Sequence, residues 1–135
     1  MNRKDARENA FILLFEKYFN NELSIQEILN TALDVRDFCT DEFCELLANG
    51  VTDSLQTIDG TFVKFLNGWS VDRISKVSLI VLRIAVYEML FIKEIPYAVS
   101  VNEAVEICKK YATEDDASFV NGVLSSVIKE LSANE

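Results

Sequence analysis

The chain has 135 residues, of which 50% are hydrophobic and 26% are charged, a balance typical of one globular domain. Its 13 basic and 22 acidic residues give a formal net charge of −9, so its overall field repels nucleic acid. The chain contains no histidine, which excludes Ser-His-Asp and Cys-His nucleophile pairs and every zinc site that uses histidine. Its three cysteines show no pairing pattern and no apolar run could span a membrane, so we expect a cytoplasmic protein.

Apolar residues at helical spacing define most of the chain. Four glycines and one proline are few helix breakers, so long helices are expected. The spacing predicts helices over 6–19, 25–33, 41–58, 76–93, 100–111 and 118–131, with one or two further turns at 62–66 and a loop at 113–116. The segment 76–93 is apolar on nearly all sides and is expected at the centre of a bundle. We therefore predict an all-α fold of six to seven helices.

Local signals predict where several helices begin and end. In a capping box, a serine is followed three residues later by a glutamate, and each satisfies a free amide of the other. Two such boxes occur, at Ser24 and at Ser100. Thr40 is predicted to cap the third helix, and Asp59 with Gly60 to end it.

Catalytic and metal-binding chemistry finds little support in the sequence. Acidic pairs at 41–42 and 115–116 lack the glycine-interrupted spacing of a calcium loop and fit helix starts better. Phosphate-binding glycine loops and nucleophile motifs are missing, so we expect no enzyme, cofactor or metal. Glu88, on the apolar segment, is best explained by a structural partner or by a snorkelling side chain.

The N-terminus combines basic and aromatic residues. Basic residues outnumber acidic ones only in segments 1–17 and 64–93, which either solvate the surface or fold onto one face that attracts an anion. In the first segment, cations precede aromatic residues: Arg3, Lys4, Arg7, then Phe11, Phe15 and Tyr18. Phosphate contacts from the cations and base stacking on the rings would suit single-stranded RNA. Alternatively, the charges solvate the terminus and the rings are core, which we favour for Phe11 and Phe15.

Three sequence blocks, in order, resemble the NusB family of bacterial transcription antitermination factors. They are Leu82-Arg83-Ile84-Ala85-Val86-Tyr87-Glu88, then Ile95-Pro96-Tyr97 with Val101-Asn102-Glu103-Ala104-Val105-Glu106, then Phe119-Val120-Asn121-Gly122-Val123-Leu124. The segment 6–15 and the pair at 69–70 are similar to the family's first helix and to its turn before the central helix. The resemblance covers about residues 6–128. Gly122 is expected to let two helices approach closely.

The resemblance implies a fold and a role. It implies a single NusB-like RNA-binding domain over 1–135, made of two packed bundles of three or four helices. It further implies binding of boxA RNA together with NusE, a small-subunit ribosomal protein, and through that complex an effect on RNA polymerase. A free homodimer is also compatible with the sequence. Two alternatives stay open: a protein-interaction module of the same fold that has lost RNA binding, and the RNA-binding domain of an rRNA cytosine methyltransferase.

The same resemblance assigns residues to each partner. The RNA-facing residues it implies are Arg3, Lys4, Arg7, Arg83, Phe119 and Asn121. The NusE-facing residues it implies are Tyr18, Ser78, Leu79 and Asp115. The chain departs from the family where acids interrupt a shorter N-terminal basic cluster, and where Ser78 and Leu79 replace a common acidic-basic pair. With three or four phosphates neutralised, log affinity for RNA should fall with log salt at a slope of about −2 to −3.

Overall fold

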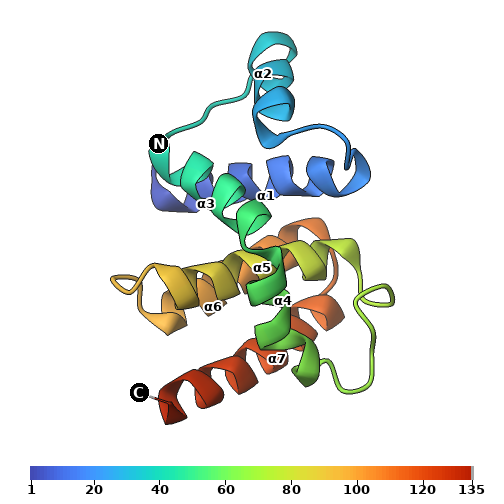
Figure 1. Ribbon diagram of the computed structural model, residues 1–135, viewed down its shortest axis with the longest axis vertical. Helices are drawn as coiled ribbons and strands as arrows, with labels where there is room; N and C mark the ends of the chain where they lie inside the picture. Colours follow the sequence, from blue (N-terminus) through green and yellow to red (C-terminus); the bar gives the residue numbers. More distant parts are fainter. Residues whose placement is uncertain (135) are drawn as a thin grey trace. The chain divides into compact units, whose positions relative to one another are not determined.

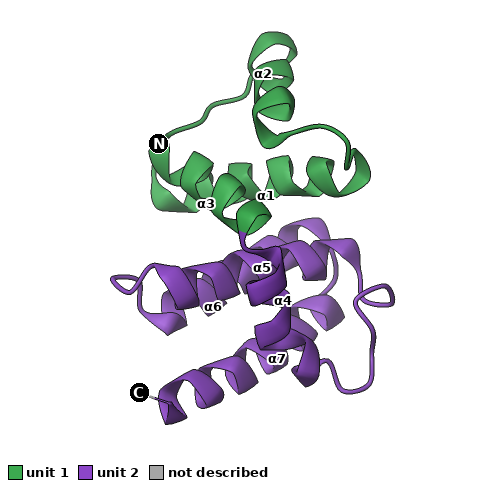
Figure 2. Ribbon diagram, viewed as in Figure 1, with its two compact units in different colours: residues 1–53 green, residues 54–135 purple. Residues whose placement is uncertain are grey.

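The computed structural model describes residues 1–134. Within this range it contains seven α-helices and one short 3₁₀ helix, and no strand (Figure 1). The predicted all-α fold is therefore confirmed. The chain divides into two compact units, with the boundary between Asp53 and Ser54 (Figure 2).

The first unit, Met1–Asp53, is built on one long helix. Its helices are α1 (Arg3–Phe19), α2 (Ile25–Val35) and α3 (Glu42–Asp53), and α1 packs against both of the others. The apolar face predicted for α1 is buried at Ala10, Phe11 and Leu14. This packing places the start of α1 against α3.

The second unit begins at Ser54 and contains the remaining helices. They are α4 (Leu55–Phe62), the 3₁₀ helix η1 (Val63–Phe65), α5 (Lys76–Phe91), α6 (Tyr97–Tyr111) and α7 (Glu114–Ala133). The helices α5, α6 and α7 pack against one another, and α4 packs on α5 and α7. Buried residues lie on all sides of α5, which confirms its predicted central position.

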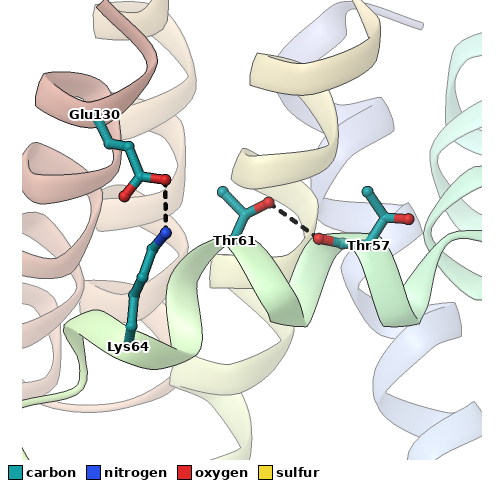
Figure 3. A network of polar contacts seen from close by, with 4 residues as sticks. All are labelled: Thr57, Thr61, Lys64 and Glu130. Atoms are coloured by element: carbon teal, nitrogen blue, oxygen red, sulfur yellow. Dashed lines mark hydrogen bonds and ion pairs between the residues drawn. The ribbon is translucent and has the colours of Figure 1, made fainter. Parts of the chain in front are cut away.

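Two polar contacts lie at the surface of this unit, one between η1 and α7 and one within α4. The Lys64 ammonium lies 2.6 Å from Glu130 Oε1, and the Thr61 hydroxyl donates to the Thr57 carbonyl at 3.0 Å (Figure 3). Both groups of the ion pair are partly exposed. Exposed pairs of this kind contribute about 0–1 kcal/mol, so this contact fixes geometry more than stability.

One of the two predicted capping boxes is confirmed. Ser24 Oγ accepts from the Glu27 amide and Glu27 Oε1 accepts from the Ser24 amide, both at 3.0 Å. Hydrogen bonds to the Glu27 carboxyl from the Ser24 backbone amide, and secondarily from the Ser24 side chain, hold the pKa of this carboxyl below its ordinary value. The box at Ser100 is wrong, because α6 already begins at Tyr97, after Pro96. Ser100 is buried inside the helix, and its hydroxyl donates to Glu88 Oε1 at 2.7 Å.

The third helix differs from its prediction at both ends. Asp41, rather than Thr40, provides the cap, since its Oδ1 accepts from the Cys44 amide at 2.8 Å. The predicted single helix is broken at Ser54, and Gly60 lies within α4 instead of ending a helix. Spacing missed the break because it reports which residues are apolar and not which backbone hydrogen bonds form.

Two expectations near α7 are also wrong. The predicted loop at 113–116 is the first turn of α7, which Thr113 caps by accepting from the Asp116 amide at 3.0 Å. Gly122 is exposed, and a methyl group built on it would meet no atom within 4 Å. No close helix approach therefore depends on this glycine.

Candidate nucleic-acid interface

The first turn of α1 carries the basic cluster of Arg3, Lys4 and Arg7. Asn2 caps this helix, with its side-chain oxygen accepting from the Asp5 amide at 2.8 Å. The guanidinium carbon of Arg3 lies 3.8 Å from the centre of the Phe43 ring, on α3. The guanidinium carbon of Arg7 lies 5.3 Å from the same ring. The structure thus brings two of the predicted RNA-facing cations together on one aromatic side chain.

These three cations differ in exposure. Arg3 and Lys4 are exposed, whereas Arg7 has only 4% of its surface accessible. A nearly inaccessible guanidinium cannot make extensive direct contacts with a phosphate. Within this cluster, Arg3 and Lys4 expose their side chains to a ligand, whereas Arg7 is buried near the Phe43 ring.

Aromatic residues continue along α1. Phe11 is buried as expected, while Phe15 and Tyr18 are half-buried and Phe19 is 59% exposed. The ring centres of Phe15 and Phe19 are 5.1 Å apart, and those of Tyr18 and Phe19 are 5.2 Å apart. Phe19 was missed by the sequence reasoning, although its place beside polar Asn20 at the helix end is the kind of signal that marks an exposed ring.

Arg83, on α5 of the second unit, is held by an acidic residue of α4. Its Nε and one terminal nitrogen donate to the two carboxylate oxygens of Asp59, at 3.0 and 2.8 Å. Only 13% of the Arg83 side chain is exposed. This two-point pairing gives Arg83 a structural role and leaves little of its surface for a transcript.

Phe119 and Asp115 meet in one cleft of the second unit. The cleft has a volume of about 250 Å³ and is lined by Trp69, Arg73, Ile74, Ser75, Asp115, Asp116 and Phe119. Asn121 is exposed on the same helix as Phe119, and Trp69 is 55% exposed. Sequence reasoning did not select Trp69 or Arg73 as site residues, because neither the loop conformation nor its neighbours follow from residue spacing.

The residues expected to face NusE are placed in different surroundings. Tyr18 is half-buried and Asp115 is exposed. Ser78 and Leu79 have no accessible surface, and the Ser75 hydroxyl donates to Ser78 Oγ at 2.9 Å. A side chain without exposed surface makes no direct contact with a second protein in this conformation, so a role of Ser78 and Leu79 toward NusE would act through the residues that cover them.

The described residues offer no arrangement of acidic and thiol groups that could hold a metal ion. Across residues 1–134, no helix is both long and apolar enough to cross a membrane.

Comparison with known proteins identifies the family. A family model described as the NusB family matches residues 4–129. The chain belongs to the NusB family. The transcription antitermination protein NusB of Ruminiclostridium cellulolyticum is 40% identical, over 100% of this chain and 97% of that protein.

Solved structures of NusB proteins share the fold. T. maritima NusB is 37% identical with a TM-score of 0.86, over 96% of this chain and 92% of that one. Another structure holds antitermination factors NusB and NusE in complex with double-stranded RNA. It is 28% identical with a TM-score of 0.83, over 95% of this chain and 96% of that one.

Proposed function

We propose that this chain is a transcription antitermination factor that binds boxA-type RNA together with NusE and helps RNA polymerase resist termination. It acts as an adaptor without catalytic chemistry and works in the cytoplasm. Family membership over residues 4–129 is the observation that carries this proposal. The NusB–NusE–RNA structure, whose NusB resembles this chain over nearly its whole length, supports the choice of partners.

The RNA contacts we propose in the first unit lie at the first turn of α1. Arg3 and Lys4 are exposed there, and each can neutralise one phosphate. In the second unit, exposed Asn121 and half-buried Phe119 offer a hydrogen-bonding group and a ring on which a base can stack. We assign Arg7 and Arg83 an indirect role, each within its own unit, because one is buried and the other is paired with Asp59.

The NusE contacts we propose are Tyr18, in the first unit, and Asp115, in the second. Tyr18 lies in the aromatic row at the end of α1, beside exposed Phe19. An exposed aromatic side chain next to a half-buried one is the kind of apolar anchor that protein interfaces use. Asp115 supplies a negative charge at the start of α7.

The test is a titration of fluorescent boxA RNA with the full chain, alone and with NusE. Because the chain carries a net charge of −9, we expect weak binding alone and tighter binding in the ternary complex. Lys4→Glu should weaken ternary binding about tenfold or more, since it replaces a phosphate contact with a repulsive charge. Its melting temperature should be unchanged, because Lys4 is exposed.

A matched control is Lys109→Glu, which makes the same charge change at an exposed position of α6. It should leave RNA affinity near that of the unmodified chain. Equal losses for both variants would reduce the effect to overall charge and remove the α1 surface from the proposal.

A second candidate function is a protein-interaction module with weak RNA binding. The net charge of −9 and the pairing of Arg83 with Asp59 favour it. In the same titration it predicts NusE binding that RNA does not strengthen.

A further inference from the structure

Phe43 is a buried aromatic residue of α3 whose ring faces two arginines of α1. Only 8% of its surface is accessible. The guanidinium carbons of Arg3 and Arg7 lie 3.8 and 5.3 Å from its ring centre. Both distances fall within the roughly 6 Å at which a cation is attracted to an aromatic face. One side chain outside the basic cluster therefore organises two members of it.

The contact with the Phe43 ring offsets an unfavourable placement of two positive charges on α1. Arg3 and Arg7 are four residues apart on one helix, so their side chains lie on the same face and repel each other. Arg3 also sits in the first turn, where the positive end of the helix disfavours a cation. The negative face of the Phe43 ring counters both effects.

We infer that Phe43 is a positioning residue for RNA binding, which stacks on the Arg3 guanidinium and holds it ready for a phosphate. The inference rests on the proposed function. Stacking covers one face of the guanidinium and leaves its N–H groups, which lie in the plane, available at the edge. A flexible arginine loses rotamer freedom when it is immobilised on a ligand, and one that is already ordered loses less. Phe43 thus raises affinity without touching the RNA.

The experiment is a double-mutant cycle on ternary binding of fluorescent boxA RNA to the full chain with NusE. Phe43→Leu keeps an apolar side chain in place but removes the ring, and should weaken binding about threefold to tenfold. Arg3→Ala should also weaken binding, and the two changes together should cost little more than Arg3→Ala alone. Lys4→Ala serves as the comparison position, and its effect should simply add to that of Phe43→Leu.

Two further variants separate an effect on the position of Arg3 from a general loss of stability in the first unit. Phe11→Leu makes the same change at another buried position of this unit and should leave RNA affinity unchanged. Replacing Phe43 with 3,4,5-trifluorophenylalanine keeps the ring's shape but removes the negative potential of its face, and should weaken binding as Phe43→Leu does. The fluorinated variant decides the question if Phe43→Leu does not fold.

Each outcome separates the inference from the proposed function. If the unmodified chain and NusE bind no RNA, both fail. If they bind RNA while the Phe43 variants bind as tightly, the inference is wrong and the proposed function stands. Effects of Phe43→Leu and Arg3→Ala that add fully would also overturn it, because positioning requires the two residues to act as one.

Discussion

At the scale of single residues, basic side chains that look alike in the sequence meet different surroundings. Arg3 lies over the Phe43 ring and stays exposed, Arg7 is buried near the same ring, and Arg83 is fixed by two hydrogen bonds to Asp59. The sequence identified these arginines as candidates through their positive charge and through the family resemblance. It could not supply their environments, because Asp59 lies 24 positions from Arg83 and Phe43 lies on another helix.

Ser100 illustrates a residue whose role depends on a distant partner. Ser100→Ala removes the hydroxyl that donates to the buried Glu88 carboxylate, and should lower the free energy of unfolding by about 1–3 kcal/mol. Urea denaturation measures this change. Ser70→Ala, at an exposed serine, should be nearly neutral, and an equally small effect at Ser100 would contradict a stabilising bond.

The cysteines predict a pH dependence. Burial raises the pKa of the Cys108 thiol to about 11, from its ordinary value of 9.0, and also raises the pKa of Cys44. Iodoacetamide at pH 8 should therefore modify only exposed Cys39 in the folded chain, as mass spectrometry would detect. Because the unfolded state releases the Cys108 proton first, the free energy of unfolding should fall as pH rises from 9.0 to about 11. Rapid native modification of Cys108 would contradict its burial.

At the scale of helices, spacing was a good guide to buried faces and a poor one to ends. It predicted the central position of α5 and the apolar face of α1, because both depend on which residues meet water. It missed the break at Ser54 and the true start of α6, since both depend on backbone hydrogen bonds that packing decides. The capping box at Ser24 formed as predicted because its two residues lie within one turn. Ser100 lies inside α6 instead, and its hydroxyl donates to Glu88 on α5.

The Arg83–Asp59 contact links α5 to α4 and can be tested by a double-mutant cycle. Arg83→Met and Asp59→Leu should each lower the free energy of unfolding by about 1–3 kcal/mol, and together by less than the sum. The exposed Lys64–Glu130 pair should show a coupling below about 1 kcal/mol. If Arg83→Met leaves stability intact but weakens RNA binding, the RNA-facing role implied by the resemblance is correct.

At the scale of the whole molecule, the number of phosphates that the chain neutralises sets the salt dependence of RNA binding. The sequence alone suggested three or four phosphate contacts, but Arg7 is buried and Arg83 is paired. About two contacts, from Arg3 and Lys4, should give a slope of about −1.4 for log affinity against log salt. Titrations of the full chain without NusE, across a range of KCl concentrations, measure it. A slope steeper than about −2.5 would mean that further cations reach the RNA.

The three sequence blocks that resemble the NusB family explain why the family could be predicted, whereas the site could be predicted only in outline. Those blocks lie mainly on α5, α6 and α7, where packing constrains sequence. The cleft lined by Trp69 and Phe119 joins a loop to a helix fifty residues later, and only folding brings them together.

The exposed thiol of Cys39 has a practical consequence for the question of self-association. A surface cysteine in air-equilibrated buffer oxidises, and two copies of the chain can then be joined through a disulfide between their Cys39 sulfurs. A species of twice the chain's mass on gel filtration is therefore a disulfide-linked product of oxidation during storage, unless it persists in dithiothreitol. Cys39→Ser prevents this disulfide, so gel filtration of the variant detects only a non-covalent dimer.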